Sequence, residues 1–327
     1  MYSPDHVWRI DADLRALRPQ AVAVLDMANE QAWRVIPPML LEMLRLRVGA
    51  LIGNTAGLLR RSNTARGQGL SEAKIEQLAD YYKSDVFSDH EKRCLTFAEQ
   101  FVIDVTGVTE ADLHGLGQFA EPHLLHEFVA ALYVTECTQR LEIMAPILLG
   151  GVGAASRQTN EFAPAGDASE GLAATLERYQ ETVVLGADLD PVVTEMVRLR
   201  CARTHDCRIC KTLRLTDARA LGVDDAMTAK IDFYEHTDLD ERIKIALRVV
   251  DAFITRPDML APAVIDDARS AFTPTALAEL CLDITKWSVQ KIYVAQRSDA
   301  ADFLPKNDQG LSFFSFDNDG RVAGFSA

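Results

Sequence analysis

The stretch Glu42-Met43-Leu44-Arg45-Leu46-Arg47 recurs 153 residues later as Glu195-Met196-Val197-Arg198-Leu199-Arg200. Five of the six positions are identical, and the sixth exchanges one aliphatic side chain for another. Further along the chain the offset settles at 152, as in the pairs Leu95 and Leu247, Phe101 and Phe253, and Pro122 and Pro274. Matches at a nearly constant offset are typical of an internal repeat. The sequence therefore predicts a tandem duplication of a unit of roughly 130 residues.

The pattern inside each unit is helical. Apolar residues recur at steps of three and four, which is the period of an amphipathic helix. Residues 88–103 begin with Ser88 and Glu91, the pattern of a capping box, and 240–254 follow Asp240, a good N-cap. Two long helices are predicted over 122–147 and 274–296, each with proline in its first turn. The fold class expected is all-α.

Composition changes mark the boundaries of the units. We expect helical units at 1–150 and 172–302, because 151–171 is rich in glycine, alanine and small polar residues, as linkers are. The tail at 303–327 alternates apolar and polar residues around Asn318-Asp319-Gly320. This pattern predicts a short C-terminal β-hairpin, with a disordered tail as the alternative.

The charge of the chain excludes several classes of partner. Its 327 residues hold 34 Lys and Arg against 48 Asp and Glu, for a formal charge of -14. Binding to nucleic acid or to an anionic membrane surface requires a basic face, so neither partner is expected. The chain has no apolar run near the ~20 residues of a membrane span, and its first residues do not resemble a secretory signal. We expect a cytoplasmic protein.

The second unit carries the reactive residues. Of six cysteines, only Cys207 and Cys210 have a chemically significant spacing, C-x-x-C, which in a reducing compartment indicates a redox pair or a metal site. If Cys207 opens a helix, then Cys210 and Arg214 share its face, and the helix dipole favours the thiolate. Residues 198–219 also hold seven Lys or Arg against two Asp. A turn near Thr204–Asp206 would bring Glu195 back toward the thiols.

With Glu195 twelve residues before this C-x-x-C, the chain resembles the carboxymuconolactone decarboxylase family, and within it the AhpD-like alkylhydroperoxidase branch. The resemblance covers the second unit well and the first through the duplication. It implies an all-α unit, assembly into homo-oligomers, and peroxidase chemistry. It also implies that Cys210 is the peroxidatic thiol, Cys207 the resolving thiol, and Glu195 the carboxylate of a proton relay.

The sequence departs from that family pattern at both histidines of the relay. Ile209 lies inside the C-x-x-C, and Arg214 stands where the downstream histidine would be. Arginine cannot act as a base near neutral pH, although it can hold a thiolate or an anionic substrate. His205 is the nearest remaining imidazole and is the candidate proton shuttle. Arg214 and Arg198 are the candidate anion-binding residues.

The first unit has lost the thiols. Glu42 is kept, but Asn54 stands at the position of Cys207 and Gly57 at that of Cys210. A redox role is therefore excluded for this unit, and a structural role is expected. Because Glu42 persists without thiols, Glu195 has a competing interpretation as half of a structural ion pair.

We expect an antioxidant oxidoreductase that reduces a hydroperoxide or exchanges disulfides through Cys207 and Cys210. It would need a small-molecule substrate and a thiol reductant of unknown identity, and no cofactor or metal. One alternative is a non-redox enzyme of the lactone decarboxylase type acting on a small acid, and another is a catalytically silent helical scaffold. For the cysteines alone, inert thiols and a structural zinc site remain open. For His205 the alternative is an ordinary loop histidine, and for Arg214 a solvated helix face.

Overall fold

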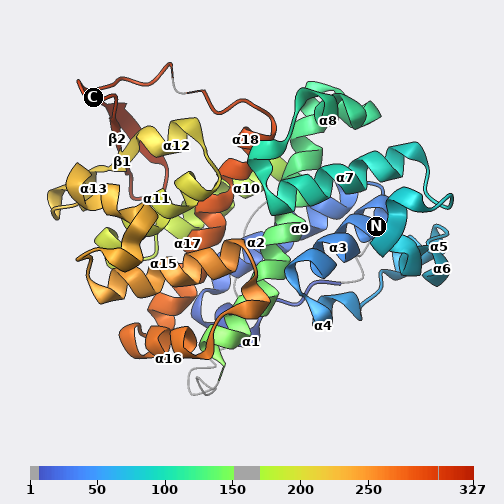
Figure 1. Cartoon of the computed structure of the whole chain (residues 1–327), viewed down its shortest axis with the longest axis horizontal. Helices are drawn as coiled ribbons and strands as arrows, with labels where there is room; N and C mark the ends of the chain where they lie inside the picture. The colour runs from blue at the N-terminus through green and yellow to red at the C-terminus, as the bar shows by residue number, and fades with distance from the viewer. Residues whose placement is uncertain (1–6, 151–169, 301) are drawn as a thin grey trace.

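The computed structural model describes residues 7–150, 170–300 and 302–327 (Figure 1). Helices make up most of the described chain, and its strands are three short ones in a single sheet. The predicted all-α class with strands in the C-terminal tail is confirmed. Most of the predicted linker lies outside the described residues.

Two successions of helices follow one another along the described chain. The first comprises α1 (Ala12–Leu17), α2 (Pro19–Val35), α3 (Pro38–Ile52), α4 (Thr55–Leu58), α5 (Asn63–Gly67), α6 (Glu72–Glu76), α7 (Asp89–Ile103), α8 (Glu110–Gly115) and α9 (Pro122–Leu149). The second comprises α10 (Leu172–Val184), α11 (Pro191–Thr204), α12 (Arg208–Thr212), α13 (Thr216–Ala220), α14 (Asp225–Ala229), α15 (Glu241–Ile254), α16 (Pro262–Ala271), α17 (Pro274–Ser288) and α18 (Gln290–Ala295).

Local signals placed several of these helix ends correctly. Ser88 caps α7 in a reciprocal capping box with Glu91, and the Asp240 side chain caps α15. The helix predicted over 274–296 is instead divided at Val289 into α17 and α18. Apolar periodicity does not reveal such a break, because both pieces continue along the same buried path.

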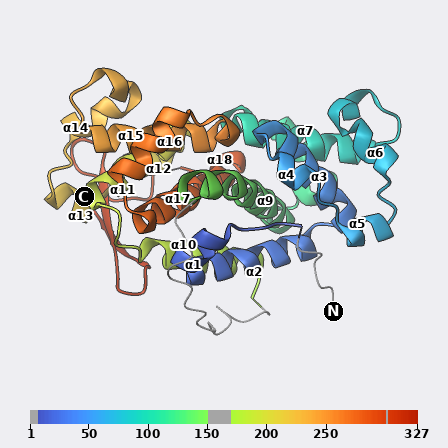
Figure 2. The ribbon, with the colours of Figure 1, turned by 90° about the horizontal axis from the view of Figure 1, so that it is seen from below.

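The two successions of helices share one core. Buried apolar residues from both form a single continuous cluster. The long helix α9 packs against α2 and α3 of its own unit and against α17 of the second, and α2 packs against α10 (Figure 2). Figure 2 shows α9 and α17 between a layer containing α1, α2 and α10 and a layer containing α7 and α15. The units therefore meet over an extensive buried face.

The C-terminal tail forms the predicted hairpin. β2 (Ser312–Phe316) pairs antiparallel with β3 (Val322–Ser326), and the turn includes Gly320 with φ of 80°. A third strand, β1 (Leu213–Leu215), pairs in parallel with β2. This strand was not predicted, because its pairing partner lies about a hundred residues away in the sequence. The hairpin is thereby attached to the C-x-x-C segment.

Candidate functional site

A tight turn delivers the cysteine pair. α11 ends in a Schellman motif, in which the Cys207 N–H donates to Ala202 O at 3.0 Å and the Asp206 N–H to Arg203 O at 3.1 Å. Asp206 adopts φ of 51°, a left-handed conformation that aspartate tolerates better than most residues. The predicted reversal near Thr204–Asp206 is therefore present.

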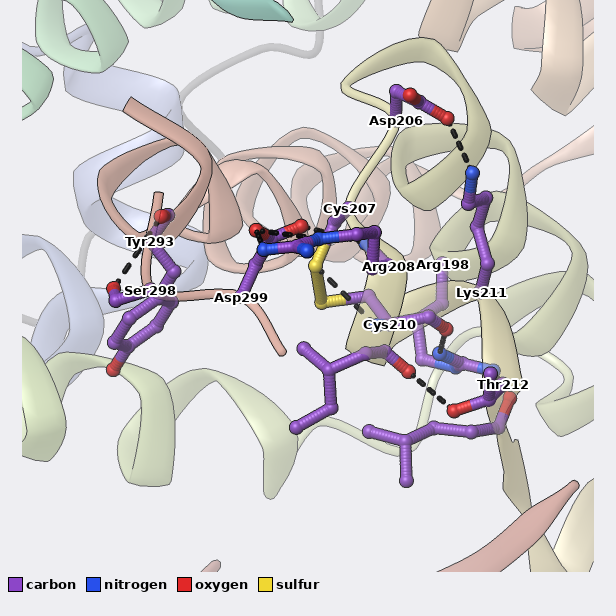
Figure 3. The surroundings of a disulfide bond; sticks show 12 residues. Arg198, Asp206, Cys207, Arg208, Cys210, Lys211, Thr212, Tyr293, Ser298 and Asp299 are labelled. Carbon is purple, nitrogen blue, oxygen red and sulfur yellow. Dashed lines mark hydrogen bonds and ion pairs between the residues drawn. A yellow bond between two sulfur atoms is a disulfide. The ribbon is translucent and has the colours of Figure 1, made fainter. Parts of the chain in front are cut away.

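Cys207 and Cys210 are joined by a disulfide (Figure 3). Cys207 is fully buried and is the N-cap of α12, where its Sγ accepts a hydrogen bond from the Cys210 N–H at 3.3 Å. Cys210 is partly exposed. Because α12 has only five residues, its dipole is small, and the amide of Cys210 is the hydrogen-bond donor to Cys207 Sγ in the structure.

An acidic residue after α18 holds the disulfide helix in place. Asp299 accepts hydrogen bonds from the Arg208 N–H at 2.8 Å and from the Arg208 guanidinium at 2.7 Å, as Figure 3 shows. The Ile209 N–H donates to the Asp299 carbonyl oxygen at 3.1 Å. Lys211 likewise forms an ion pair with Asp206. Much of the excess positive charge seen in the sequence is thus neutralised locally.

Glu195 and Arg198 form a buried ion pair beside the cysteines. Arg198 Nε and Nη2 donate to the two Glu195 oxygens at 2.6 and 2.8 Å. Arg198 also donates to Cys210 O at 3.1 Å and Leu213 O at 2.5 Å, and the Leu215 N–H donates to Glu195 at 3.3 Å. The pair therefore fastens the C-x-x-C loop to α11, which is what a structural role requires. A proton-accepting role for Glu195 and an anion-binding role for Arg198 stay predictions.

His205 is enclosed at the end of α11. It is 4% exposed, and its Nε2 lies 3.2 Å from Ser288 Oγ. Burial, with the positive charges of Lys291 and Arg140, lowers the pKa of His205 well below its ordinary value. The imidazole is therefore neutral near pH 7. As a proton shuttle His205 stays a prediction.

Arg214 does not lie on the disulfide helix. α12 ends at Thr212 and the chain continues as β1, so the expectation of one helical face carrying both cysteines and Arg214 is wrong. The pairing of Arg214 with Phe313 across the sheet overrides local helical tendency. Its side chain is buried rather than on a solvated face, with 8% of its surface exposed. Burial and the neighbouring charge of Arg198 lower the pKa of its guanidinium.

Two curated proteins of Mycobacterium tuberculosis are similar to this chain over most of its length. They are Uncharacterized protein Rv2313c of strain ATCC 25618 / H37Rv and Uncharacterized protein MT2376 of strain CDC 1551 / Oshkosh. Each is 31% identical over 275 residues, which are 83% of this chain and 92% of the relative. The chain belongs to their family. No protein-family model and no solved structure matches it.

The first unit repeats the loop-fastening contacts without cysteines. Arg45 binds Glu42 at 2.7 and 2.8 Å and donates to the carbonyl oxygens of Gly57 and Arg60, both at 2.9 Å. The Ser62 N–H donates to Glu42 at 3.0 Å. Each residue lies 153 positions before its counterpart in the second unit. The ion pair therefore forms in the same way whether or not thiols are present.

Asn54 occupies the place of Cys207. Its Oδ1 accepts a hydrogen bond from the Gly57 N–H at 2.9 Å, as Cys207 Sγ does from Cys210, and its Nδ2 donates to Glu142 at 2.8 Å. Gly57 must lack a side chain, because a Cβ there would lie 2.4 Å from the Asn54 amide nitrogen. An amide network thus replaces the disulfide, which supports a structural role for the first unit.

Three residues of this site were not expected from the sequence. Asp299 holds Arg208, and Trp287 lies with its ring 5.9 Å from the Arg198 guanidinium. Lys286 is 3% exposed, with Nζ 3.1 Å from the Trp287 ring centre and 4.8 Å from that of Phe316 in the hairpin. Comparison of the two units could have indicated Lys286, because the residue at the equivalent position of the first unit is Val134.

The other cysteines are not reactive candidates. The four remaining cysteines are Cys94, Cys137, Cys201 and Cys281. Each is buried and forms no disulfide, and burial raises the pKa of each thiol to about 12. Within the described ranges, no three His, Cys, Asp or Glu side chains are placed to hold a metal ion. In the same part of the chain, no helix has the length and apolar character needed to cross a membrane.

Of two cavities in the described chain, only the smaller is lined by a candidate site residue. One of about 190 Å³ lies between α1–α2 and α10–α17, with Arg18 and Glu279 in its wall, and neither residue of the disulfide lines it. The other, of about 10 Å³, is lined by His205, Ser288 and Lys291 among others and has room for about one water molecule. Neither includes Arg214.

Proposed function

We propose that this protein is a thiol-dependent oxidoreductase that reduces an organic hydroperoxide with the Cys207–Cys210 pair. The observation that carries the proposal is the asymmetry of the disulfide, in which Cys210 is partly exposed and Cys207 is fully buried. Only the exposed sulfur can meet a substrate directly. The buried sulfur lies next to it and is suited to resolving the oxidised product.

The chemistry balances with one substrate and one reductant. The Cys210 thiolate attacks the distal oxygen of the hydroperoxide, the O–O bond breaks, and the alcohol leaves with a proton. The resulting sulfenic acid is attacked by the Cys207 thiolate, which forms the disulfide and releases water once the hydroxide is protonated. An external dithiol then returns two electrons and two protons. We propose this external reductant together with a cytoplasmic location and a homo-oligomeric state.

The two alternatives receive less support. A lactone-decarboxylase mechanism requires a carboxylate available to a substrate, whereas Glu195 is engaged by Arg198 and by the Leu215 N–H. A silent scaffold fits the first unit, in which Asn54 and Gly57 replace the thiols. It leaves unexplained why the second unit has a cysteine pair with one sulfur exposed.

Thiol trapping tests the proposal. Reduced protein is mixed with one equivalent of cumene hydroperoxide, alkylated at set times, and analysed by mass spectrometry. We expect a Cys207–Cys210 disulfide to form as the peroxide is consumed. In Cys207→Ser, Cys210 should stop at the sulfenic acid, and in Cys210→Ser the peroxide should persist. Cys94→Ser is the matched control and should react as the wild type does. Unchanged thiols with undiminished peroxide in the wild-type protein would refute the proposal.

A further inference from the structure

Arg214 has hydrogen-bond donors that no residue of the described chain accepts. Its Nη1 donates to Lys211 O and Leu213 O, both at 2.8 Å. Its Nε is buried without a partner, and its Nη2 makes no hydrogen bond within the described residues. No carboxylate among those residues lies within ion-pair distance of it, although the residue is only 8% exposed. A buried guanidinium with unused donors is costly, because the lost hydration is not replaced.

The unused edge is the one by which several arginines of this protein bind carboxylates. Arg45 and Arg198 grip their glutamates through Nε and Nη2 together. Arg208 uses the same two atoms on Asp299, and Arg248 uses them on Glu235. This side-on fork matches the two oxygens of a carboxylate. The edge of Arg214 therefore has the geometry of a carboxylate receptor.

The first unit shows what satisfies this arginine when no thiols are present. Arg61, 153 residues before Arg214, binds Glu72 through Nε at 3.1 Å. The counterpart of Glu72 is Asp225, whose side chain is one methylene shorter and whose ion-pair partner is Arg219 at 3.6 Å. In the cysteine-bearing unit, Asp225 thus acts on the arginine through its charge alone, without the hydrogen bond that Glu72 accepts from Arg61.

From these contacts we propose that the Nε–Nη2 edge of Arg214 binds the carboxylate of the substrate, so that the preferred hydroperoxide is an organic anion. This inference rests on the proposed function and adds the substrate class to it. Nη1 of Arg214 bonds to the carbonyl of Lys211, the residue after Cys210, so the guanidinium lies beside the disulfide helix. The proposal requires that a substrate bound there by its carboxylate extend from the guanidinium to the Cys210 sulfur.

The charges around Arg214 favour an anionic hydroperoxide over a neutral one. The chain carries a net charge of -14, which repels an anion from most of its surface. Near the disulfide, Arg208 and Lys211 are paired with Asp299 and Asp206, whereas Arg214 is left as a cation without a carboxylate partner in the described residues. A neutral hydroperoxide gains nothing from this cation, whereas a carboxylate gains two charge-assisted hydrogen bonds.

Two matched substrates test the inference. Reduced protein is mixed with cumene hydroperoxide or with its analogue that carries a para carboxylate, and disulfide formation is timed. We expect the carboxylate-bearing hydroperoxide to form the disulfide about tenfold faster or more, because one hydrogen bond to a charged group changes a binding constant by about that factor. In Arg214→Gln the ratio of the two rates should fall toward one. Arg61→Gln, the matched change in the first unit, should leave the ratio at the wild-type value.

Binding gives a readout that needs no redox chemistry. Titration calorimetry with 4-isopropylbenzoate and with neutral 4-isopropylbenzyl alcohol should detect only the benzoate, and Arg214→Gln should abolish its binding. Equal reaction of both hydroperoxides would overturn the anion inference while leaving the peroxidase proposal intact. Failure of both hydroperoxides, with benzoate still bound at Arg214, would refute the peroxidase proposal and keep the anion site. Absence of benzoate binding would overturn the site itself.

Discussion

His205 shows how the surroundings of one residue set its chemistry. A loop histidine two residues before a cysteine is expected to titrate near neutral pH. In the structure it is enclosed by α18 and α9, with Ser288 as its hydrogen-bond partner and the cations Lys291 and Arg140 nearby. Protonation would add a third positive charge to that space. The side chain is therefore held in its neutral form.

The enclosure of His205 leads to a prediction about how the free energy of unfolding depends on pH. Because the pKa of His205 is lowered on folding, the unfolded chain binds a proton below about pH 6.5 that the folded protein refuses. The free energy of unfolding should therefore decrease as the pH falls below that value, by up to about 1.4 kcal/mol per pH unit. In His205→Leu this component of the slope should vanish, as measured by urea unfolding between pH 7 and 5.

The control for this measurement is His123→Gln, which changes an exposed histidine. It should keep the wild-type slope. If His205→Leu also kept that slope, then the imidazole would be free to protonate in the folded protein, and its enclosure would not hold in solution.

At the scale of elements, the C-terminal hairpin pairs with the strand that follows the cystine loop. β2 pairs with β1, and the ring of Phe314 lies 5.5 Å from the Arg198 guanidinium. Arg321 in the hairpin turn forms an ion pair with Glu181 at 3.1 Å, and Gly320 packs against the backbone of the same residue. The pairing of β2 with β1, the strand that carries Arg214, thus depends on how the hairpin turn docks on α10.

Gly320→Ala should loosen this docking. The residue has φ of 80°, and an added Cβ would lie 2.2 Å from the Glu181 carbonyl oxygen, which as backbone cannot easily move away. We expect faster hydrogen exchange at residues 213–215 and, in the reduced protein, faster alkylation of Cys210, because weaker pairing of β1 loosens the segment that follows the disulfide helix.

Gly310→Ala is the matched control for the hairpin. It has a similar φ of 76°, so it carries the same backbone cost, but an added Cβ would meet no atom within 4 Å. Its exchange and alkylation should change little. Equal effects of the two substitutions would mean that backbone strain, and not the contact with Glu181, controls the hairpin.

At the scale of the whole molecule, a buried ion cluster joins the two units. Glu136 of α9 accepts hydrogen bonds from Arg140, one turn away, and from Lys291 of α18 at 2.7 and 2.8 Å. All three side chains are nearly fully buried. Burial lowers the pKa of Lys291 to about 8 even though Glu136 opposes the shift. The carboxylate therefore compensates two cations where the units meet.

Removing that carboxylate should weaken the whole fold. Glu136→Gln leaves two buried cations without a counter-charge, and we expect a loss of about 3–5 kcal/mol in the free energy of unfolding. Urea unfolding measures it, with Asp80→Asn as control, because the Asp80–Lys83 pair is exposed and contributes little. The double variant Glu136→Gln with Lys291→Met should regain part of the loss. A cost below 1 kcal/mol in the single variant would contradict the joining role.

Much of this protein could be predicted from its sequence because the signals are local. The helical class, the caps at Ser88 and Asp240 and the hairpin around Gly320 depend on neighbours a few residues apart. The same holds for the position of Cys207 at a helix start and for the reversal before it. Such features follow from periodicity, capping and turn chemistry, which a single stretch of chain contains.

Only the tertiary structure decided how the site is completed. Asp299 reaches back 91 residues to Arg208, and β2 draws Arg214 out of the predicted helix into a sheet. The aspartate that replaces Glu72 leaves the Arg214 edge without an internal carboxylate. These outcomes depend on side chains that meet across long loops, and no local pattern encodes such distances. The sequence by itself determined which residues are candidates for the chemistry, and long-range packing decided which contacts those residues make.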